Sequence, residues 1–285
     1  MVGAMRHESL DSGGLSYAPC RYGLSRTYFR GPKKSLDDNY FAFLGGSGTY
    51  GKFVEQPFPA RLEGDLDQTC VNFGVVNGGI DVYANDPVVM SACQGARATV
   101  LQVMGAQNLS NRFYQVLPRR NDRFLSASTV LRALYPEVDF AEFSFTRHML
   151  GALYTRSAEK FEIVRSELQS AWLARMKTLI GQIGSPVVLL WFSEVTYDDT
   201  PWHRRRNALQ ADPLFVDAPM VESLRPMVHD IIVSRPSGPA RAEGTDGMVF
   251  PLLHRDAANE MPGVMAHKEA AAKLAPTLRG LLPKN

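Results

Sequence analysis

The sequence predicts a three-layer α/β protein with a parallel five-stranded sheet and a helical insertion after the third strand. Two observations lead to this expectation. Short apolar runs alternate along the chain with segments of helical periodicity, and that alternation is typical of parallel sheets with right-handed crossovers. A glycine-rich turn also follows the first apolar run directly, as in the loops that face the ligand crevice of open α/β sheets.

The composition is that of an ordinary globular protein. The 285 residues are 45% hydrophobic and 21% charged with a net charge of +2, which suits one large α/β domain and gives no reason to expect nucleic acid as a partner. The three cysteines lack metal-ligand spacing, so we expect no metal site and a reducing compartment. The chain shows no apolar signal core and no run of about 18 apolar residues, which favours a cytoplasmic protein without a membrane span.

The first half of the chain carries three expected strands. An aromatic run at 40–44 suits a buried strand and ends in the glycine-rich turn 45–52. Asp86 and Pro87 begin a helix, because an acidic cap followed by proline is a common helix start. The other expected elements are a helix at about 52–66 interrupted by prolines, a second strand at 71–74 and an apolar third strand at 99–104.

The second half adds a long insertion and two more strands. Apolar residues that include Phe161, Val164 and Leu168 recur at helical spacing over 159–183, which indicates a core-packing stripe. We divide the chain into an N-terminal basic and aromatic arm and one α/β domain. The expected ranges are the arm at 1–36, the domain at 37–285, its mostly helical insertion at about 109–184, strands at 187–192 and 229–233, and a last helix at 264–282.

The turn after the first strand is open to several interpretations. Gly46-Ser-Gly-Thr-Tyr-Gly-Lys52 fits a phosphate-binding loop, in which backbone N–H groups and a lysine cradle phosphate, although Phe53 stands where a magnesium-binding hydroxyl residue belongs. Ser47-Gly-Thr49 also resembles the core of the loop with which sulfotransferases hold a nucleotide sulfate donor. A tight strand-to-helix turn without chemistry is a further interpretation.

Another interpretation rests on a resemblance that extends over most of the chain. Gly45-Gly46-Ser47 is similar to the Gly-Asp-Ser turn of the SGNH/GDSL hydrolases, with Gly46 in place of the aspartate. The segments 72–78 and 100–108 look like the second and third blocks of that superfamily. The resemblance implies a flavodoxin-like, SGNH-like sheet with Ser47 as nucleophile, Gly78 as backbone oxyanion donor, and Gln107 and Asn108 at the amide positions, where a side-chain N–H can stabilise charge on a carbonyl oxygen.

The last block of that superfamily is not matched. Met261 stands where the catalytic histidine belongs, and Ala258 stands where its aspartate belongs. A serine needs a neighbouring base to attack at neutral pH, and His254, with Asp256 close behind it, is the candidate from the same loop. The whole chain also resembles an alphaproteobacterial protein family that supplies no activity to carry over.

A group of basic residues is expected at one edge of the sheet. If the strands are parallel, the loops at their carboxyl ends meet there, and these loops are rich in arginine, whose planar fork suits carboxylate, sulfate and phosphate. Pairing with nearby carboxylates such as Asp122 or Asp198 is the alternative for any single arginine. The candidate anion-binding residues are Lys52, Arg112, Arg119, Arg120, Arg123, Arg204 and Arg205, with His203, Arg206 and Arg235 in the same loops.

Three functions remain open from the sequence. The leading one is an acyl-ester hydrolase or acyltransferase that acts on a small-molecule or carbohydrate-like anionic substrate and needs no cofactor. The second is a nucleotide-donor transferase, for which coenzyme A or a nucleotide sulfate donor would be the cosubstrate. The third is a non-catalytic binding protein on a degenerate hydrolase scaffold. They differ in whether the loop at 45–52 turns a side chain or a row of backbone N–H groups towards the crevice.

Overall fold

The predicted parallel sheet is confirmed. A computed structural model describes residues 14–204 and 208–283 and contains a five-stranded parallel sheet in the order β2-β1-β3-β6-β7. This is the flavodoxin-like arrangement, in which the second strand lies outside the first and the later strands follow on the other side. The strands are β1 (Tyr40–Leu44), β2 (Thr69–Asn72), β3 (Ala98–Gln102), β6 (Val187–Phe192) and β7 (Asp230–Ser234).

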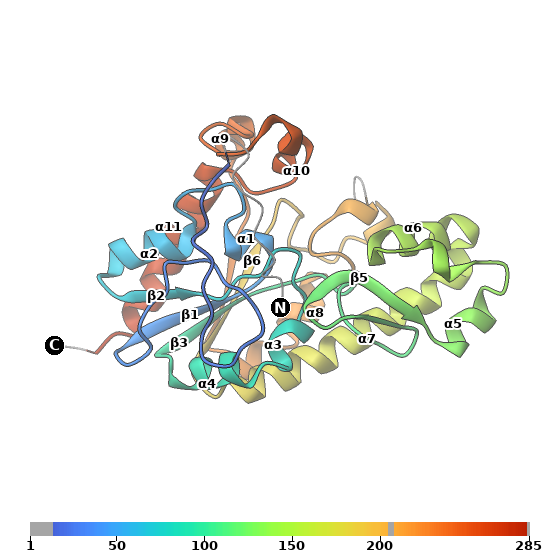
Figure 1. Cartoon of the computed structure of the whole chain (residues 1–285), viewed down its shortest axis with the longest axis horizontal. Helices are drawn as coiled ribbons and strands as arrows, with labels where there is room; N and C mark the ends of the chain where they lie inside the picture. Colours follow the sequence, from blue (N-terminus) through green and yellow to red (C-terminus); the bar gives the residue numbers. More distant parts are fainter. Residues whose placement is uncertain (1–13, 205–207, 284–285) are drawn as a thin grey trace, which may run out of the picture.

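Both faces of the sheet are covered by helices. Every residue of β1, β3 and β6 is buried, as expected for central strands with helices on both sides. On one face, Phe41 and Leu190 pack with residues of α2 (Phe58–Leu66) and α11 (Val264–Gly280). On the other face, Leu44 and Trp191 pack in a larger cluster that includes α4 (Pro87–Gly95) and α7 (Ala158–Ile183) (Figure 1).

The insertion after β3 is helical except for an antiparallel hairpin. The hairpin consists of β4 (Tyr114–Leu117) and β5 (Arg120–Ala127), and it was not predicted from the sequence. After it come α5 (Thr129–Leu134), η1 (Phe140–Glu142), α6 (Thr146–Arg156) and then α7, whose apolar stripe is buried as predicted. The hairpin shares no hydrogen-bonded pairing with the main sheet in the described ranges.

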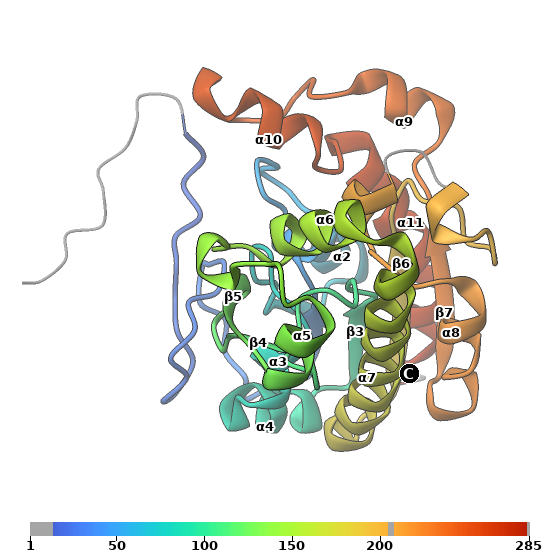
Figure 2. The ribbon, with the colours of Figure 1, turned by 90° about the vertical axis from the view of Figure 1, so that its right-hand side faces the viewer.

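The segments that connect β6 to β7 and β7 to α11 are short helical turns joined by loops. Between β6 and β7 lie η2 (Trp202–Arg204), η3 (Ala208–Gln210), α8 (Ala218–Glu222) and η4 (Arg225–Met227). Between β7 and α11 lie α9 (Gly238–Glu243), η5 (Leu252–His254) and α10 (Arg255–Asn259). The segment that carries α9 and α10 forms the outermost layer at the top of both views (Figures 1 and 2). Within the described ranges, no helix has the length and apolarity needed to cross a membrane.

The described part of the N-terminal arm packs on the domain. Tyr22 and Phe29 are buried and contact the edge of Phe73, with ring centroids 5.1 Å away in each case. Arg30 of the arm is buried as well. Its guanidinium is satisfied there because it donates to three carbonyl oxygens, those of Tyr50, Gly51 and Glu55.

Candidate functional site

The candidate site lies at the switch point of the sheet. From β1 the chain crosses outward to β2, whereas β3 lies on the other side of β1 and continues to β6. In open α/β sheets, ligands bind outside the carboxyl ends of the strands where the order reverses in this way. The loop after β1 begins with Gly45 and carries Ser47, and the loop after β3 carries Asn108.

The loop after β1 forms one turn of helix rather than an open cradle. The turn, α1 (Ser47–Tyr50), ends at Gly51, whose φ of 71° is left-handed. A side chain on Gly51 would be strained and would also approach the Cβ of Pro57 to 2.3 Å. Arg30 donates to the terminal carbonyls of this turn, so the arm stabilises the loop that presents Ser47.

Buried hydrogen bonds fix the back of the same loop. The side-chain Oε1 of Gln102, at the end of β3, accepts from the backbone N–H of Thr49 at 2.9 Å and from its hydroxyl at 2.6 Å. Close packing also requires glycine at position 74, where a Cβ would lie 2.3 Å from the backbone N of Tyr50. The loop is therefore held by β3 on one side and by the segment after β2 on the other.

This conformation bears on the phosphate-loop interpretation. The N–H groups of Thr49, Tyr50, Gly51 and Lys52 donate to Gln102 or to carbonyls within the turn. A phosphate cradle needs a row of free backbone N–H groups, and these four are engaged inside the protein. Burial lowers the pKa of Lys52 below its usual range, while the carboxylate of Glu260 opposes that shift. The second half of the loop therefore offers no row of free amides, and the Ser47 side chain is the group of this loop that bonds to the loop after β2.

The Ser47 hydroxyl is hydrogen-bonded to Asn77, in the loop after β2. Ser47 Oγ donates to Asn77 Oδ1 at 3.1 Å and accepts from the Asn77 backbone N–H at 3.0 Å. The Asn77 side-chain Nδ2 in turn reaches Asp122 Oδ2 at 3.4 Å. Asn77 was not among the residues predicted from the sequence; its place in an Asn-Gly-Gly turn, which favours the left-handed conformation, is the signal that could have found it.

Asn108 joins the same cluster from the loop after β3. Its Nδ2 donates to the backbone oxygen of Asn77 at 3.3 Å, and its Oδ1 accepts from the Thr146 hydroxyl at 2.8 Å. The bond from Thr146 fixes which end of the amide faces Asn77. Gly79 lets the two loops approach, since a Cβ there would lie 1.8 Å from the Asn108 carbonyl oxygen.

The other residues proposed for catalysis occupy different positions. Gln107 is buried below the surface, and no partner is found for its Oε1 among the described residues. The Gly78 N–H donates to Val75 O at 2.9 Å, so the N–H that faces Ser47 is that of Asn77. His254 is exposed at the end of η5, and its ring centroid lies 6.0 Å from that of Phe53.

Several arginines proposed to bind an anion have partners of their own. Arg112 pairs with Glu167 of α7 at 2.9 Å, and Arg123 lies over the ring of Phe145. Arg120 pairs with Asp122 at 3.3 Å, which places it beside the Ser47 cluster. Arg119 and Arg204 are exposed, in the hairpin turn and in η2, whereas Arg205 and Arg206 lie outside the described residues.

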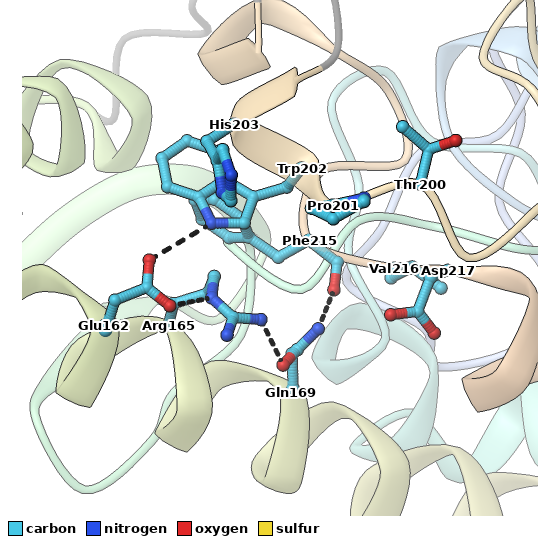
Figure 3. Close-up of a pocket in the computed structure, with 10 residues that line it drawn as sticks. All are labelled: Glu162, Arg165, Gln169, Thr200, Pro201, Trp202, His203, Phe215, Val216 and Asp217. Atoms are coloured by element: carbon cyan, nitrogen blue, oxygen red, sulfur yellow. Dashed lines mark hydrogen bonds and ion pairs between the residues drawn. The ribbon is translucent and has the colours of Figure 1, made fainter.

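A separate hollow of about 190 Å³ lies between α7 and the loop before α8 (Figure 3). Three of its polar side chains are engaged: Arg165 donates to Glu162 and Gln169, and Gln169 donates to the backbone carbonyl of Phe215. A second, more open hollow of about 430 Å³ is lined by residues of α7 and by Arg112. The residues that line these two hollows do not include Ser47, Asn77 or Asn108.

Among the residues described, no group of three or more His, Cys, Asp or Glu could hold a metal ion.

Comparison with known proteins gives a family but no activity. Residues 5–282 match a domain of unknown function, DUF6473. The chain belongs to that family. No curated protein matches it. Among solved structures, the DUF6473 fold is similar to the lipase Lip_vut3 from a goat rumen metagenome, at 13% sequence identity and a TM-score of 0.44, over 86% of this chain and 98% of the lipase chain. A likeness at that level supports no statement about activity.

Proposed function

We propose that this protein is an SGNH-like acyl-ester hydrolase or acyltransferase whose nucleophile is Ser47. The observation that carries the proposal is the meeting of three groups at the switch point of the sheet. They are the Ser47 hydroxyl after β1, the Asn77 backbone N–H after β2 and the Asn108 side-chain amide after β3. A hydroxyl beside two N–H donors is the arrangement that acyl transfer requires.

The reaction follows from these groups. Ser47 Oγ attacks the carbonyl carbon of an ester, its proton passes to a base, and the negative charge that develops on the carbonyl oxygen is stabilised by the side-chain amide of Asn108, while the Asn77 N–H holds Oγ. The ester C–O bond then breaks and the leaving alcohol takes up a proton. Water, or an acceptor hydroxyl in the transferase, releases the acyl group from Ser47. His254 is the proposed base, carried by the segment that contacts Phe53.

The substrate proposed is anionic and carbohydrate-like, or linked to a donor such as coenzyme A. Arg120, which is linked to the Ser47 cluster through Asp122, and the neighbouring exposed Arg119 support the anionic character. The three cysteines of the chain are free thiols, which fits the reducing, cytoplasmic setting expected from the sequence.

A non-catalytic binding protein is the second candidate, and one observation favours it. Both hydrogen bonds of the Ser47 hydroxyl found in the structure go to Asn77, and an amide cannot take up the hydroxyl proton. In that case the same cluster would bind a polar ligand without turnover.

A fluorophosphonate probe separates the two candidates. If Ser47 is the nucleophile, mass spectrometry finds the label on its peptide, Ser47→Ala abolishes labelling, and Asn108→Ala slows labelling by about 10²–10³-fold, the usual effect of one oxyanion donor. Ser35→Ala is the matched control, because the Ser35 hydroxyl also donates to a neighbouring side chain, that of Asp37, but lies outside the site. Labelling that persists in Ser47→Ala would refute the nucleophile, and a folded protein that never labels would favour the binding protein.

A further inference from the structure

Asn77 holds the Ser47 hydroxyl from two directions. Its backbone N–H donates to Ser47 Oγ at 3.0 Å, and its side-chain Oδ1 accepts from the same hydroxyl at 3.1 Å. The first bond fixes the position of the oxygen, and the second fixes the direction of the O–H bond. One residue thus sets the complete orientation of the proposed nucleophile.

Asn77 is itself fixed by its surroundings. Its backbone has a left-handed φ of 54°. Residues other than glycine adopt this conformation rarely, and Asn, Asp and His adopt it most often. Its carbonyl accepts from Asn108, and its side-chain Nδ2 points at Asp122. Asp122 is 8% exposed, and its other oxygen faces Arg120. The rotamer of Asn77 therefore depends on a largely buried, paired carboxylate.

The row Ser47–Asn77–Asp122 has the order of a nucleophile, a base and a carboxylate, with an amide in the position of the base. In a serine catalytic triad, the middle residue takes the hydroxyl proton, and the carboxylate orients that middle residue. The Asn77 amide is oriented in the same way by Asp122, but it can only hold the hydroxyl and cannot accept its proton.

We infer that Asn77, oriented by Asp122, is the positioning residue for Ser47, and that it occupies the place where a histidine would complete a catalytic triad. The inference rests on the proposed function, because it concerns the reactivity of Ser47. It goes beyond that proposal, since it assigns the orientation of the hydroxyl to the loop after β2 and the hairpin and separates it from the group that removes the proton.

The test measures the rate at which an alkyl fluorophosphonate modifies Ser47, with the reaction monitored by mass spectrometry of the intact protein. In that step the Oγ–P bond forms, the P–F bond breaks, fluoride leaves, and the hydroxyl proton passes to the base and from there to water. Asn77→Gly keeps the left-handed backbone and the N–H bond but removes the side chain, so we expect the rate to fall about tenfold, the equivalent of one hydrogen bond. Asp67→Gly is the matched control, because Asp67 is also left-handed, with a φ of 49°, but is exposed at the end of α2.

The variant Asn77→His gives an independent measurement, because we expect it to increase the rate of Ser47 labelling. The imidazole would accept the proton from Ser47 Oγ, so we expect a rate about 10²-fold above that of the unchanged protein, with a rise in rate as the pH passes about 6.5. Adding Asp122→Asn to Asn77→His should remove most of that gain, because the imidazole loses its orienting carboxylate. A residue with a purely structural role would not produce this pH dependence.

The outcomes separate the inference from the proposed function. If Ser47 labels and Asn77→Gly labels at the same rate, the inference is overturned and Ser47 remains the nucleophile. If the unchanged protein never labels, the proposed function fails, and Asn77→His then decides the inference alone. Labelling of Ser47 that appears only in Asn77→His would support the assigned geometry, whereas its absence in a variant with an unchanged melting temperature would overturn it.

Discussion

Lowering the pH from 7 to 4 should destabilise this protein through a single buried histidine. His267 of α11 is fully buried, with its ring stacked on Phe58 and its edge against Phe192. Its Nδ1 accepts from the Phe58 N–H at 3.2 Å, and no partner for its Nε2 is found among the described residues. Burial, with smaller contributions from the charges of Arg30 and Arg61, lowers the pKa of His267 from 6.5 to about 3.

The sign and size of the effect follow from this shift. Below pH 6.5 the unfolded chain binds a proton at His267 that the folded protein does not bind until about pH 3, so stability falls as the pH falls through that window. Each pH unit within it removes about 1.4 kcal/mol. Between pH 7 and pH 4 the loss from His267 alone is therefore about 3 kcal/mol.

Urea unfolding at pH 4, 5, 6 and 7 measures the effect when the protein is compared with His267→Phe. The phenylalanine does not titrate and fits between the same rings, but it leaves the Phe58 N–H without an acceptor, which costs about 1–3 kcal/mol at pH 7. The two stability curves should converge towards pH 4. His254→Gln is the control for replacing a histidine as such, because His254 is exposed and the variant keeps the buried His267. Parallel curves for the protein and His267→Phe would refute the reasoning.

Two further predictions concern the loop that carries Ser47. Arg30→Ala removes three hydrogen bonds from a buried, charged donor to backbone carbonyls and should lower the free energy of unfolding by about 3–5 kcal/mol, with a smaller loss for Arg30→Lys. A shift of the urea midpoint no larger than that of a surface substitution would contradict this role. Gln102→Leu leaves the Thr49 N–H and hydroxyl without their acceptor and should cost about 2–4 kcal/mol. Adding Thr49→Val should recover part of that loss in a double-mutant cycle, and strict additivity would argue against the coupling.

The strands could be predicted wherever the apolar run coincides with the hydrogen-bonded ladder. The predicted strand at 187–192 matches β6, because a wholly apolar run lies between Pro186 and Ser193. The second strand was expected at 71–74, but β2 begins at Thr69, which pairs with Tyr40. The apolar Phe73 is buried beyond the ladder, and Gly74 passes against the loop after β1. Hydropathy measures burial and does not distinguish buried strand from buried loop.

The hairpin β4–β5 could not be predicted because its pattern is broken. Tyr114 and Val116 are buried and alternate with Gln115 and Leu117, as in a half-buried strand. Leu117 is an apolar residue on the exposed side, and the register shifts within the hairpin interrupt the period further. These features hide a two-residue period from a reading of the sequence.

For the candidate site, topology could be predicted and atomic detail could not. In a parallel sheet the loops that carry Ser47 and Asn108 lie at the same edge, and this placement follows from the strand direction alone. The choice between the N–H groups of Asn77 and Gly78 depends on the turn that Asn77 makes with its left-handed φ. Asp122 and Thr146 reach the site through the docking of the hairpin and α6, a long-range contact that no local pattern encodes.

The way the hairpin docks has a consequence for the proposed substrate site. Asn121 Oδ1 accepts the N–H groups of Gly79 and Val82, while its Nδ2 donates to the carbonyls of Leu117 and Pro118. These four hydrogen bonds help to hold an element that carries Arg119, Arg120 and Asp122 and contributes no strand to the main sheet. The charged residues beside the proposed nucleophile therefore belong to a part of the chain that the ladder of the sheet does not include. If the protein acts as proposed, replacing the exposed Arg119 should change its substrate preference and leave the stability of the parallel sheet unaltered.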